Sequence, residues 1–132
     1  MHRDLETNDL TYKVIGAAIE VHKRLGPGLL EKVYQECMLH ELQKREISAE
    51  MEFPMSVIYD DIEINSGYRI DLLVENKLVV ELKSVDAVSD LHKAQILTYM
   101  KLGGYKVGLL INFNVTKLTS GISRFVNGEI EN

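Results

Sequence analysis

Three charged residues meet around one predicted turn of this chain. Residues 68–83 have the alternating pattern of two strands, joined by a turn centred on Asn76. That turn places Asp71 directly opposite Glu81, and opposed residues of an antiparallel pair have Cβ atoms about 4.5–5.5 Å apart. Lys83 lies on the same strand face as Glu81, because side chains alternate between faces. Two facing carboxylates repel each other unless a cation lies between them, so the pattern predicts a site for a hard divalent cation such as Mg²⁺.

The same charges have a simpler interpretation as the solvated face of an amphipathic hairpin. Four residues would form that face: Arg69, Asp71, Glu81 and Lys83. The two cations would then neutralise the two acids as surface ion pairs. The position of the second strand argues against this interpretation, since a helical pattern over residues 90–102 and an apolar run over residues 105–113 follow it. That order predicts a right-handed parallel crossover and a central strand that is covered on both faces.

A polar stripe on the helix predicted over residues 90–102 supports a ligand site. His92, Gln95 and Tyr99 follow the i, i+3, i+7 spacing of one helix side. We expect this stripe to overhang the face that carries Asp71 and Glu81, where it would contact a ligand. A surface stripe with a half-buried tyrosine is the alternative.

Two helices are predicted to precede the strands. The first is expected to be capped by Asn8 or Asp9 and to end at the Gly-Pro-Gly breaker of residues 26–28. The second buries one side: Leu30, Val33, Tyr34, Cys37, Met38 and Leu42. Glu31 lies in the first turn of the second helix, where the helix dipole alone favours a carboxylate. His22 lies on the apolar side of the first helix and has the position of a hydrogen-bonded core histidine.

The remaining elements complete an α/β order. A period of two predicts a strand over residues 55–59 that returns over residues 62–65, with Gly67 as an interruption. A last short strand is predicted over residues 122–126. The chain is therefore expected to fold as an α/β protein with two helices, an antiparallel meander and a βαβ unit on one mixed sheet.

Length and composition bound the remaining possibilities. With 132 residues, one domain over residues 1–132 is expected. Hydrophobic residues make up 45% and charged residues 27%, which excludes disorder as the main state. The single cysteine, Cys37, excludes an intrachain disulfide, and the N-terminus resembles no secretory signal, so a cytoplasmic location is expected. The net charge of −5 argues against a protein held on nucleic acid by charge alone.

Beyond these patterns, the segment Gly28-Leu-Leu-Glu31-Lys-Val-Tyr34 resembles the motif that names the GxxExxY proteins. The resemblance extends over nearly the whole chain, in four blocks: GAAIEVHKRLGPGLLEKVY, GYRIDLLVENKLVVELKSV, HKAQILTYMKL and VGLLINFNV. On these blocks the chain is similar to members of the PD-(D/E)XK nuclease-like superfamily. The resemblance implies a restriction-endonuclease-like core, which agrees with the predicted order of elements.

The resemblance also implies roles for individual residues. Asp71 resembles the superfamily's aspartate, and Glu81-Leu82-Lys83 resembles its E-x-K element. Glu31 is similar to the helical acid that completes the site. Gln95 and Tyr99 resemble the Q-x-x-x-Y pair of the RecB-like branch.

The implied activity is that of a metal-dependent nuclease acting on nucleic acid, DNA above all, by attack of a water that Mg²⁺ or Mn²⁺ activates. The implied metal ligands are Asp71, Glu81, Glu31 and the carbonyl of Leu82. Lys83 and Gln95 would act on the water and the scissile phosphate. Further substrate or supporting contacts would come from Arg69, His92, Tyr99, Tyr34 and His22.

Two other classes of function stay open. The small size and the missing basic surface favour a non-cleaving or partner-dependent binding module on a nuclease-like scaffold, because little surface is left to grip a duplex. The third class is a structural or oligomerising protein whose acidic cluster is a solvated face. For a nuclease we expect a homodimer, because a small nuclease domain often needs a second copy to hold a duplex.

Overall fold

The computed structural model describes residues 5–131, which form three α-helices and one six-stranded mixed sheet. The helices are α1 (Leu5–Leu25), α2 (Glu31–Lys44) and α3 (Asp90–Gly103). The strands, in chain order and in sheet order, are β1 (Ala49–Tyr59), β2 (Ile62–Val74), β3 (Leu78–Lys83), β4 (Val107–Asn112), β5 (Ile122–Val126) and β6 (Glu129–Glu131). Neighbouring strands are antiparallel, except that β3 and β4 are parallel and joined through α3. The predicted α/β fold, with a meander followed by a βαβ unit, is confirmed.

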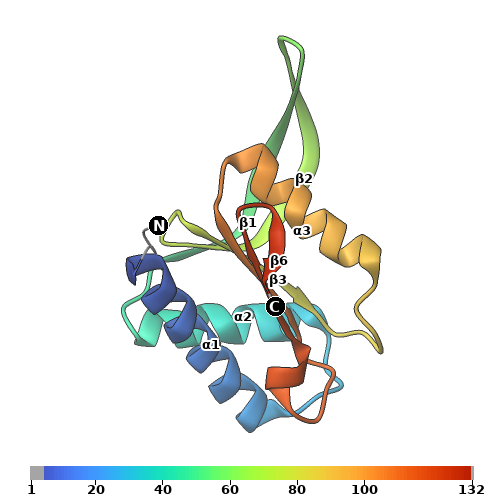
Figure 1. Ribbon diagram of the computed structural model, residues 1–132. Helices are drawn as coiled ribbons and strands as arrows, with labels where there is room; N and C mark the ends of the chain where they lie inside the picture. The colour runs from blue at the N-terminus through green and yellow to red at the C-terminus, as the bar shows by residue number, and fades with distance from the viewer. Residues whose placement is uncertain (1–4, 132) are drawn as a thin grey trace.

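The helices cover the two faces of the sheet (Figure 1). α1 and α2 pack on one face, against a core that includes Leu72 and Val80. α3 packs on the other face, against a core that includes Leu73 and Val79. Because adjacent residues of β2 and β3 enter opposite cores, these two strands are central and covered on both sides. None of the described helices has the length and apolar character needed to cross a membrane.

The first helix starts earlier than predicted. α1 begins at Leu5, so the predicted caps Asn8 and Asp9 lie inside it, and any residue before Leu5 lies outside the described residues. Inside the helix, the Asp9 carboxylate pairs with the Lys13 ammonium at 3.0 Å, an i, i+4 spacing that stabilises helices. The predicted caps are therefore wrong. An aspartate such as Asp9 is common both at a helix cap and in an exposed ion pair within a helix, so its presence does not fix where the helix begins.

The predicted burial of Leu30 and Val33 is also wrong. Their exposed fractions are 77% and 38%. Leu30 precedes the first turn of α2 and lies outside the helix, so its side chain does not follow the helical stripe. The inward side of α2 is set by Tyr34 and Met38, which are fully buried.

The β1–β2 hairpin is longer than predicted. β1 continues through Pro54. A proline is tolerated at this position because β1 is an edge strand of the sheet. Gly67 does not interrupt β2: its φ of +78° lies in a bulge, where the register with β1 shifts between Pro54 and Ser56. Beyond this bulge the hairpin projects from the body of the protein (Figure 1).

Tyr34 ties the loop between α1 and α2 to the core. Its ring stacks on Phe113, with ring centroids 4.3 Å apart and planes 8° apart. Its hydroxyl donates to the Gly26 carbonyl at 2.6 Å and accepts from the Leu29 N–H at 3.1 Å. These bonds fix the chain just before Glu31 and therefore fix where α2 begins.

We expect Tyr34→Phe to lower the free energy of unfolding by about 1–2 kcal/mol, because two backbone groups of the loop lose their partner while the ring stays packed. Urea unfolding followed by circular dichroism measures the change. Tyr12→Phe is the control, since Tyr12 is 79% exposed. Equal stability of Tyr34→Phe and the wild type would mean that water replaces the hydroxyl without cost.

Candidate functional site

The two strands that carry the predicted carboxylates separate at the candidate site. Backbone pairing between β2 and β3 ends at Leu72 and Val80. Beyond it, the Asp71 N–H donates to Glu81 Oε2 and the Leu82 N–H donates to Asp71 Oδ2, each at 2.8 Å. The register that the turn predicts is confirmed, and the two acidic residues are in direct contact across the strands. We call this region, Asp71 with Glu81 and Leu82, the strand fork.

The strand fork lies near the carboxyl ends of the parallel strands β3 and β4, where α/β sheets commonly bind ligands. Lys83 ends β3, and its carbonyl accepts from the Phe113 N–H at 2.9 Å. The buried Asn112 side chain accepts from the Val85 N–H at 3.1 Å and donates to the Val85 carbonyl at 2.9 Å. The chain on both sides of Lys83 is thus fixed to the end of β4.

Burial makes both carboxylates of the fork hard to ionise. Glu81 is 4% exposed, and burial, followed by the charge of Asp71, raises the pKa of Glu81 to about 8. Burial also raises the pKa of Asp71 to about 6, although the Leu82 hydrogen bond and the charge of Lys83 act in the opposite direction. Without a cation, the pair therefore holds a proton near neutral pH.

α3 brings part of the predicted polar stripe over the fork. Tyr99 is 5% exposed and packs in the same core as Val79, which precedes Glu81 by two residues on the same strand face. Burial and the charge of Glu81 raise the pKa of the Tyr99 hydroxyl. Gln95 Nε2 donates to this hydroxyl at 3.1 Å. The Gln95–Tyr99 pair therefore lies on the fork's side of the sheet, in agreement with the prediction.

His92 takes part in the cap of α3. Its Nδ1 accepts from the Ser89 N–H at 3.1 Å, and the Ser89 Oγ accepts from the His92 N–H at 3.2 Å. This reciprocal cap agrees with the predicted start of the helix. The imidazole also lines a groove between α3 and the hairpin, so a ligand contact of His92 stays a prediction.

Glu31 and Arg69 lie at the rim of the site. Glu31 is the first residue of α2, and its Oε2 accepts from the Ser84 N–H at 3.4 Å, next to the end of β3. Its charge contributes to the raised pKa of Asp71. Arg69 donates to the Glu52 carbonyl at 3.3 Å. Both side chains contact backbone groups beside the fork, and their roles toward metal or substrate stay predictions.

Gln35 and Glu52 are two further polar residues of the site that were not predicted from the sequence. Gln35 is 8% exposed, and its Nε2 donates to Glu52 Oε2 and to the Asp71 carbonyl, each at 2.9 Å. Glu52 lies in β1 between Met51 and Phe53, which pair with Leu72 and Ile70. Its φ is +54°, and its charge helps to raise the pKa of both fork carboxylates. Gln35 could have been predicted from its spacing, because it follows Glu31 by one helical turn and therefore lies on the same side of α2. Glu52 could not, because its part of β1 was not predicted as a strand.

His22 and Tyr34 support the fold around α2. The Tyr34 hydroxyl fixes the loop before α2, as described above. His22 Nε2 is hydrogen-bonded to the Val115 carbonyl at 2.7 Å, and its ring lies 6.3 Å from that of Phe113. These contacts agree with the interpretation of His22 as a hydrogen-bonded core histidine.

The fork offers part of a ligand set for a divalent cation. In the described part of the chain, Asp71 and Glu81 each have one oxygen that accepts a backbone hydrogen bond and one that accepts none. Residues 5–131 contain no group of three His, Cys, Asp or Glu side chains placed to hold a metal. Mg²⁺ commonly binds through one or two carboxylates and completes its shell with waters and substrate phosphates. The donors of the fork therefore fit Mg²⁺ or Mn²⁺ bound together with a substrate.

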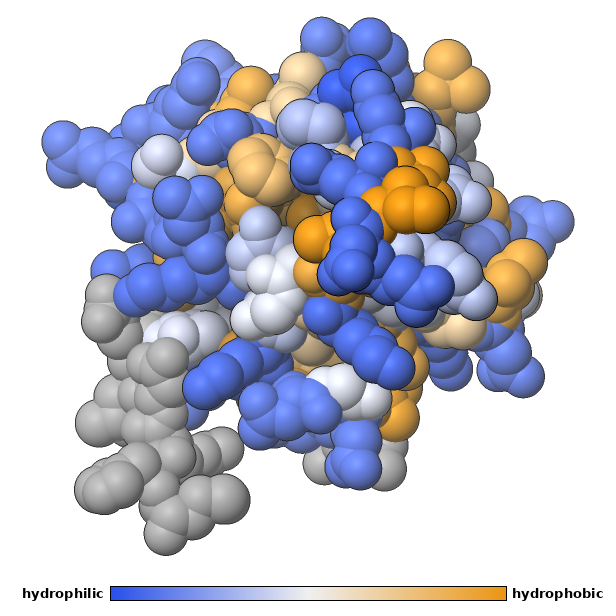
Figure 2. Space-filling model, turned by 90° about the horizontal axis from the view of Figure 1, so that it is seen from above, coloured by the Kyte–Doolittle hydropathy of each residue, from blue (hydrophilic) through white to orange (hydrophobic). Residues whose placement is uncertain are grey.

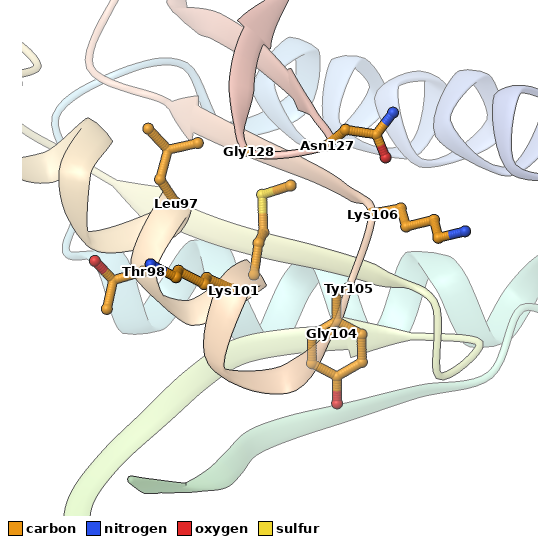
Figure 3. Close-up of a pocket in the computed structure, with 9 residues that line it drawn as sticks. Leu97, Thr98, Lys101, Gly104, Tyr105, Lys106, Asn127 and Gly128 are labelled. Carbon is orange, nitrogen blue, oxygen red and sulfur yellow. The ribbon is translucent and has the colours of Figure 1, made fainter. Parts of the chain in front are cut away.

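A hollow of about 490 Å³ lies at the opposite end of β4 from the fork (Figure 3). It is bounded by the end of α3, the start of β4 and the turn before β6. Lys101 and Lys106 line it, and in Figure 3 their side chains extend in different directions. Because these cations do not converge, the hollow has no built anion site.

The fold and the fork define an α/β nuclease-like domain, with two acids and a lysine near the ends of a parallel strand pair. The model of a family described as the PD-(D/E)XK nuclease superfamily matches residues 8–125, and the chain belongs to that superfamily. Its nucleases generally depend on divalent metal ions. No curated protein and no solved structure matches the chain. The narrower resemblance to the GxxExxY proteins stays a prediction.

Stability should depend on pH through Glu81. Because folding raises the pKa of this carboxyl group, the folded state binds its proton more tightly, and stability falls as the pH rises from about 4 toward 8. With a chelator present, we expect the wild type to lose roughly 1 kcal/mol per pH unit more than Glu81→Gln. Urea unfolding at a series of pH values gives both slopes. The exposed Glu63→Gln should follow the wild type, and equal slopes for Glu81→Gln and the wild type would contradict the raised pKa.

Proposed function

We propose that this chain is a divalent-metal-dependent phosphodiesterase that hydrolyses nucleic acid, with DNA as its substrate. The observation that carries the proposal is the strand fork, in which backbone N–H groups hold Asp71 and Glu81, with Lys83 two residues further along β3. A solvated hairpin face would leave the acids exposed, whereas Glu81 is 4% exposed. Membership of the nuclease superfamily supports the same chemistry.

The fork would hold the cation through the second oxygens of Asp71 and Glu81. When bound, a divalent cation supplies a water of lowered pKa and a positive charge that offsets charge developing on the phosphate. Glu31 and the Leu82 carbonyl are the candidates for further ligands. Because the empty pair holds a proton near neutral pH, cation binding would release it, and affinity would rise with pH.

The remaining side chains would act on the water and the phosphate. The Lys83 ammonium is a compact charge that would orient the attacking water or offset negative charge in the transition state. Gln95 would donate to the scissile phosphate, because its amide carries a second N–H beside the one that Tyr99 receives. Arg69, at the rim, would contact the substrate backbone.

The variant Asp71→Asn tests whether Asp71 is a metal ligand or a structural ion-pair partner. The amide keeps the volume and can still accept from the Leu82 N–H, while the Asp71 charge that disfavours ionisation of Glu81 is removed. We therefore expect the metal-free variant to melt at or above the wild-type temperature. Mn²⁺ at ten times its dissociation constant should add about 1.4 kcal/mol to the wild type and almost nothing to the variant. Differential scanning fluorimetry measures the metal-free melting temperature and the shift caused by Mn²⁺. Equal Mn²⁺ shifts in the variant and the wild type would place the metal elsewhere. A metal-free variant that melts well below the wild type would make Asp71 an ion-pair partner.

Lys83→Ala should abolish cleavage and leave Mn²⁺ affinity equal or higher, because the lysine is not a ligand and a nearby positive charge opposes a cation. Cleavage of labelled DNA and calorimetric Mn²⁺ titration provide the two readouts. Lys101→Ala, at the far end of α3, is the matched control and should keep both properties. Weaker Mn²⁺ binding by Lys83→Ala would show that the lysine organises the carboxylates instead.

A partner-dependent binding module is the second candidate function. The net charge of −5 favours it, as do Glu31 and Glu52, which add negative charge where a phosphate must approach. A basic partner protein would then supply the grip on nucleic acid. Mn²⁺ binding without cleavage of single-stranded, duplex or branched DNA would favour the module over the enzyme.

A further inference from the structure

A groove of about 560 Å³ lies between α3 and the projecting β1–β2 hairpin. Its volume is within the range of about 300–1,000 Å³ typical of small-ligand sites. Val57 of β1 and Tyr68 of β2 form one wall, and α3 contributes residues that include Leu91, His92, Gln95 and Tyr99. We call it the Tyr68 groove.

The lining of the Tyr68 groove is uncharged and largely apolar. Among the described residues, no Asp, Glu, Lys or Arg side chain lines it. Leu91 is 77% exposed and Tyr68 is 53% exposed. The Tyr68 ring packs against that of Tyr99, with centroids 6.1 Å apart, and about half of the Tyr68 residue stays accessible. Such a surface suits a flat neutral ring and gives no grip on a phosphate.

Polar atoms on α3 give the groove a means to bind the edge of a heterocycle. The Gln95 amide uses one N–H on the Tyr99 hydroxyl, which leaves a second N–H and a carbonyl oxygen. Unstacked nucleobases are recognised by stacking on aromatic side chains together with hydrogen bonds along their edges. The groove combines both kinds of contact.

The Tyr68 groove lies on the same side of the sheet as the strand fork. Gln95 and Tyr99 line the groove, and the same pair lies on the side of the sheet that carries Glu81. The charge of Glu81 acts on the Tyr99 hydroxyl. A nucleotide strand with a phosphate at the fork would therefore bring a neighbouring base to the groove.

The hairpin beyond the groove disfavours a second strand. Its exposed tip carries Asp60, Asp61 and Glu63, whose charges repel phosphates. Figure 2 views the molecule from the side of this tip and shows hydrophobic residues there among hydrophilic ones. An acidic tip beside an uncharged groove fits a single base better than a duplex.

We propose that the Tyr68 groove binds an unpaired nucleobase of the strand whose phosphate lies at the strand fork. The substrate class is then single-stranded or frayed nucleic acid, and Tyr68 is the stacking platform. This inference rests on the function proposed for the fork.

Fluorescence anisotropy with a labelled single-stranded 12-mer, the same oligonucleotide with abasic sites, and the corresponding duplex, all in Ca²⁺, tests the groove. We expect the wild type to prefer the single strand that carries bases. Tyr68→Ala should weaken that binding about fivefold or more, the usual effect of losing one stacked base, and leave duplex binding unchanged. Tyr68→Phe should retain it. Tyr59→Ala removes a tyrosine that is 70% exposed on the same hairpin and outside the groove, so it should bind as the wild type does.

Three results would overturn the proposal: equal single-strand affinity of Tyr68→Ala and the wild type, a preference for the duplex, or no binding of the single strand. A Tyr68→Ala variant that sediments with a different mass from the wild type would also overturn it, by making the groove an interface between copies. Failure of the groove is distinguishable from failure of the fork, because Asp71→Asn would still abolish metal-dependent cleavage if the groove alone is wrong.

Discussion

In the strand fork, the backbone N–H groups of Asp71 and Leu82 donate to side-chain carboxyl groups. In the adjoining part of the β2–β3 pair, the backbone N–H groups donate to backbone carbonyl oxygens instead. Hydrogen bonds from N–H groups to ionised carboxylates are stronger than those to neutral acceptors, and a backbone donor has no side-chain freedom to lose. The exchange therefore holds both acids in place while each retains one oxygen for a ligand. Burial acts against ionisation at the same time, because it raises the pKa of Asp71 and of Glu81. The fork is thus rigid, but its two carboxyl groups lack a positive partner in direct contact among the described residues, which is why we propose a divalent cation there.

The surrounding elements keep the fork in this state. Gln35 bridges β1 and β2 from α2, through one bond to Glu52 and one to the Asp71 carbonyl. Asn112 fixes the loop after β3, and α3 covers the opposite face with Tyr99. Each contact comes from a different part of the chain. The site therefore depends on the complete fold and does not form from the hairpin alone.

The parts of the site that follow from local rules could be predicted from the sequence. The contact of Asp71 with Glu81 depends on strand alternation and on one turn, at which Asn76 adopts a φ of +56°. Glu52 could not be predicted, because its place near Asp71 depends on a strand that passes through a proline and on a left-handed φ that sequence patterns disfavour. The exposure of Leu30 also depended on context, since it is set by the residue at which α2 begins. Local alternation and turn chemistry were reliable, whereas long-range pairing and helix boundaries needed the structure.

The most direct measurement is anomalous diffraction from Mn²⁺ in crystals of the wild-type chain, since carboxylate oxygens suit this ion. The account predicts one dominant anomalous peak at the strand fork, within coordination distance of an oxygen of Asp71 and an oxygen of Glu81, about 2.0–2.6 Å for ions of this kind. The hydrogen bonds from the Asp71 and Leu82 N–H groups should persist beside it. A dominant peak elsewhere, or none at the fork while both carboxylates keep their metal-free positions, would contradict the account.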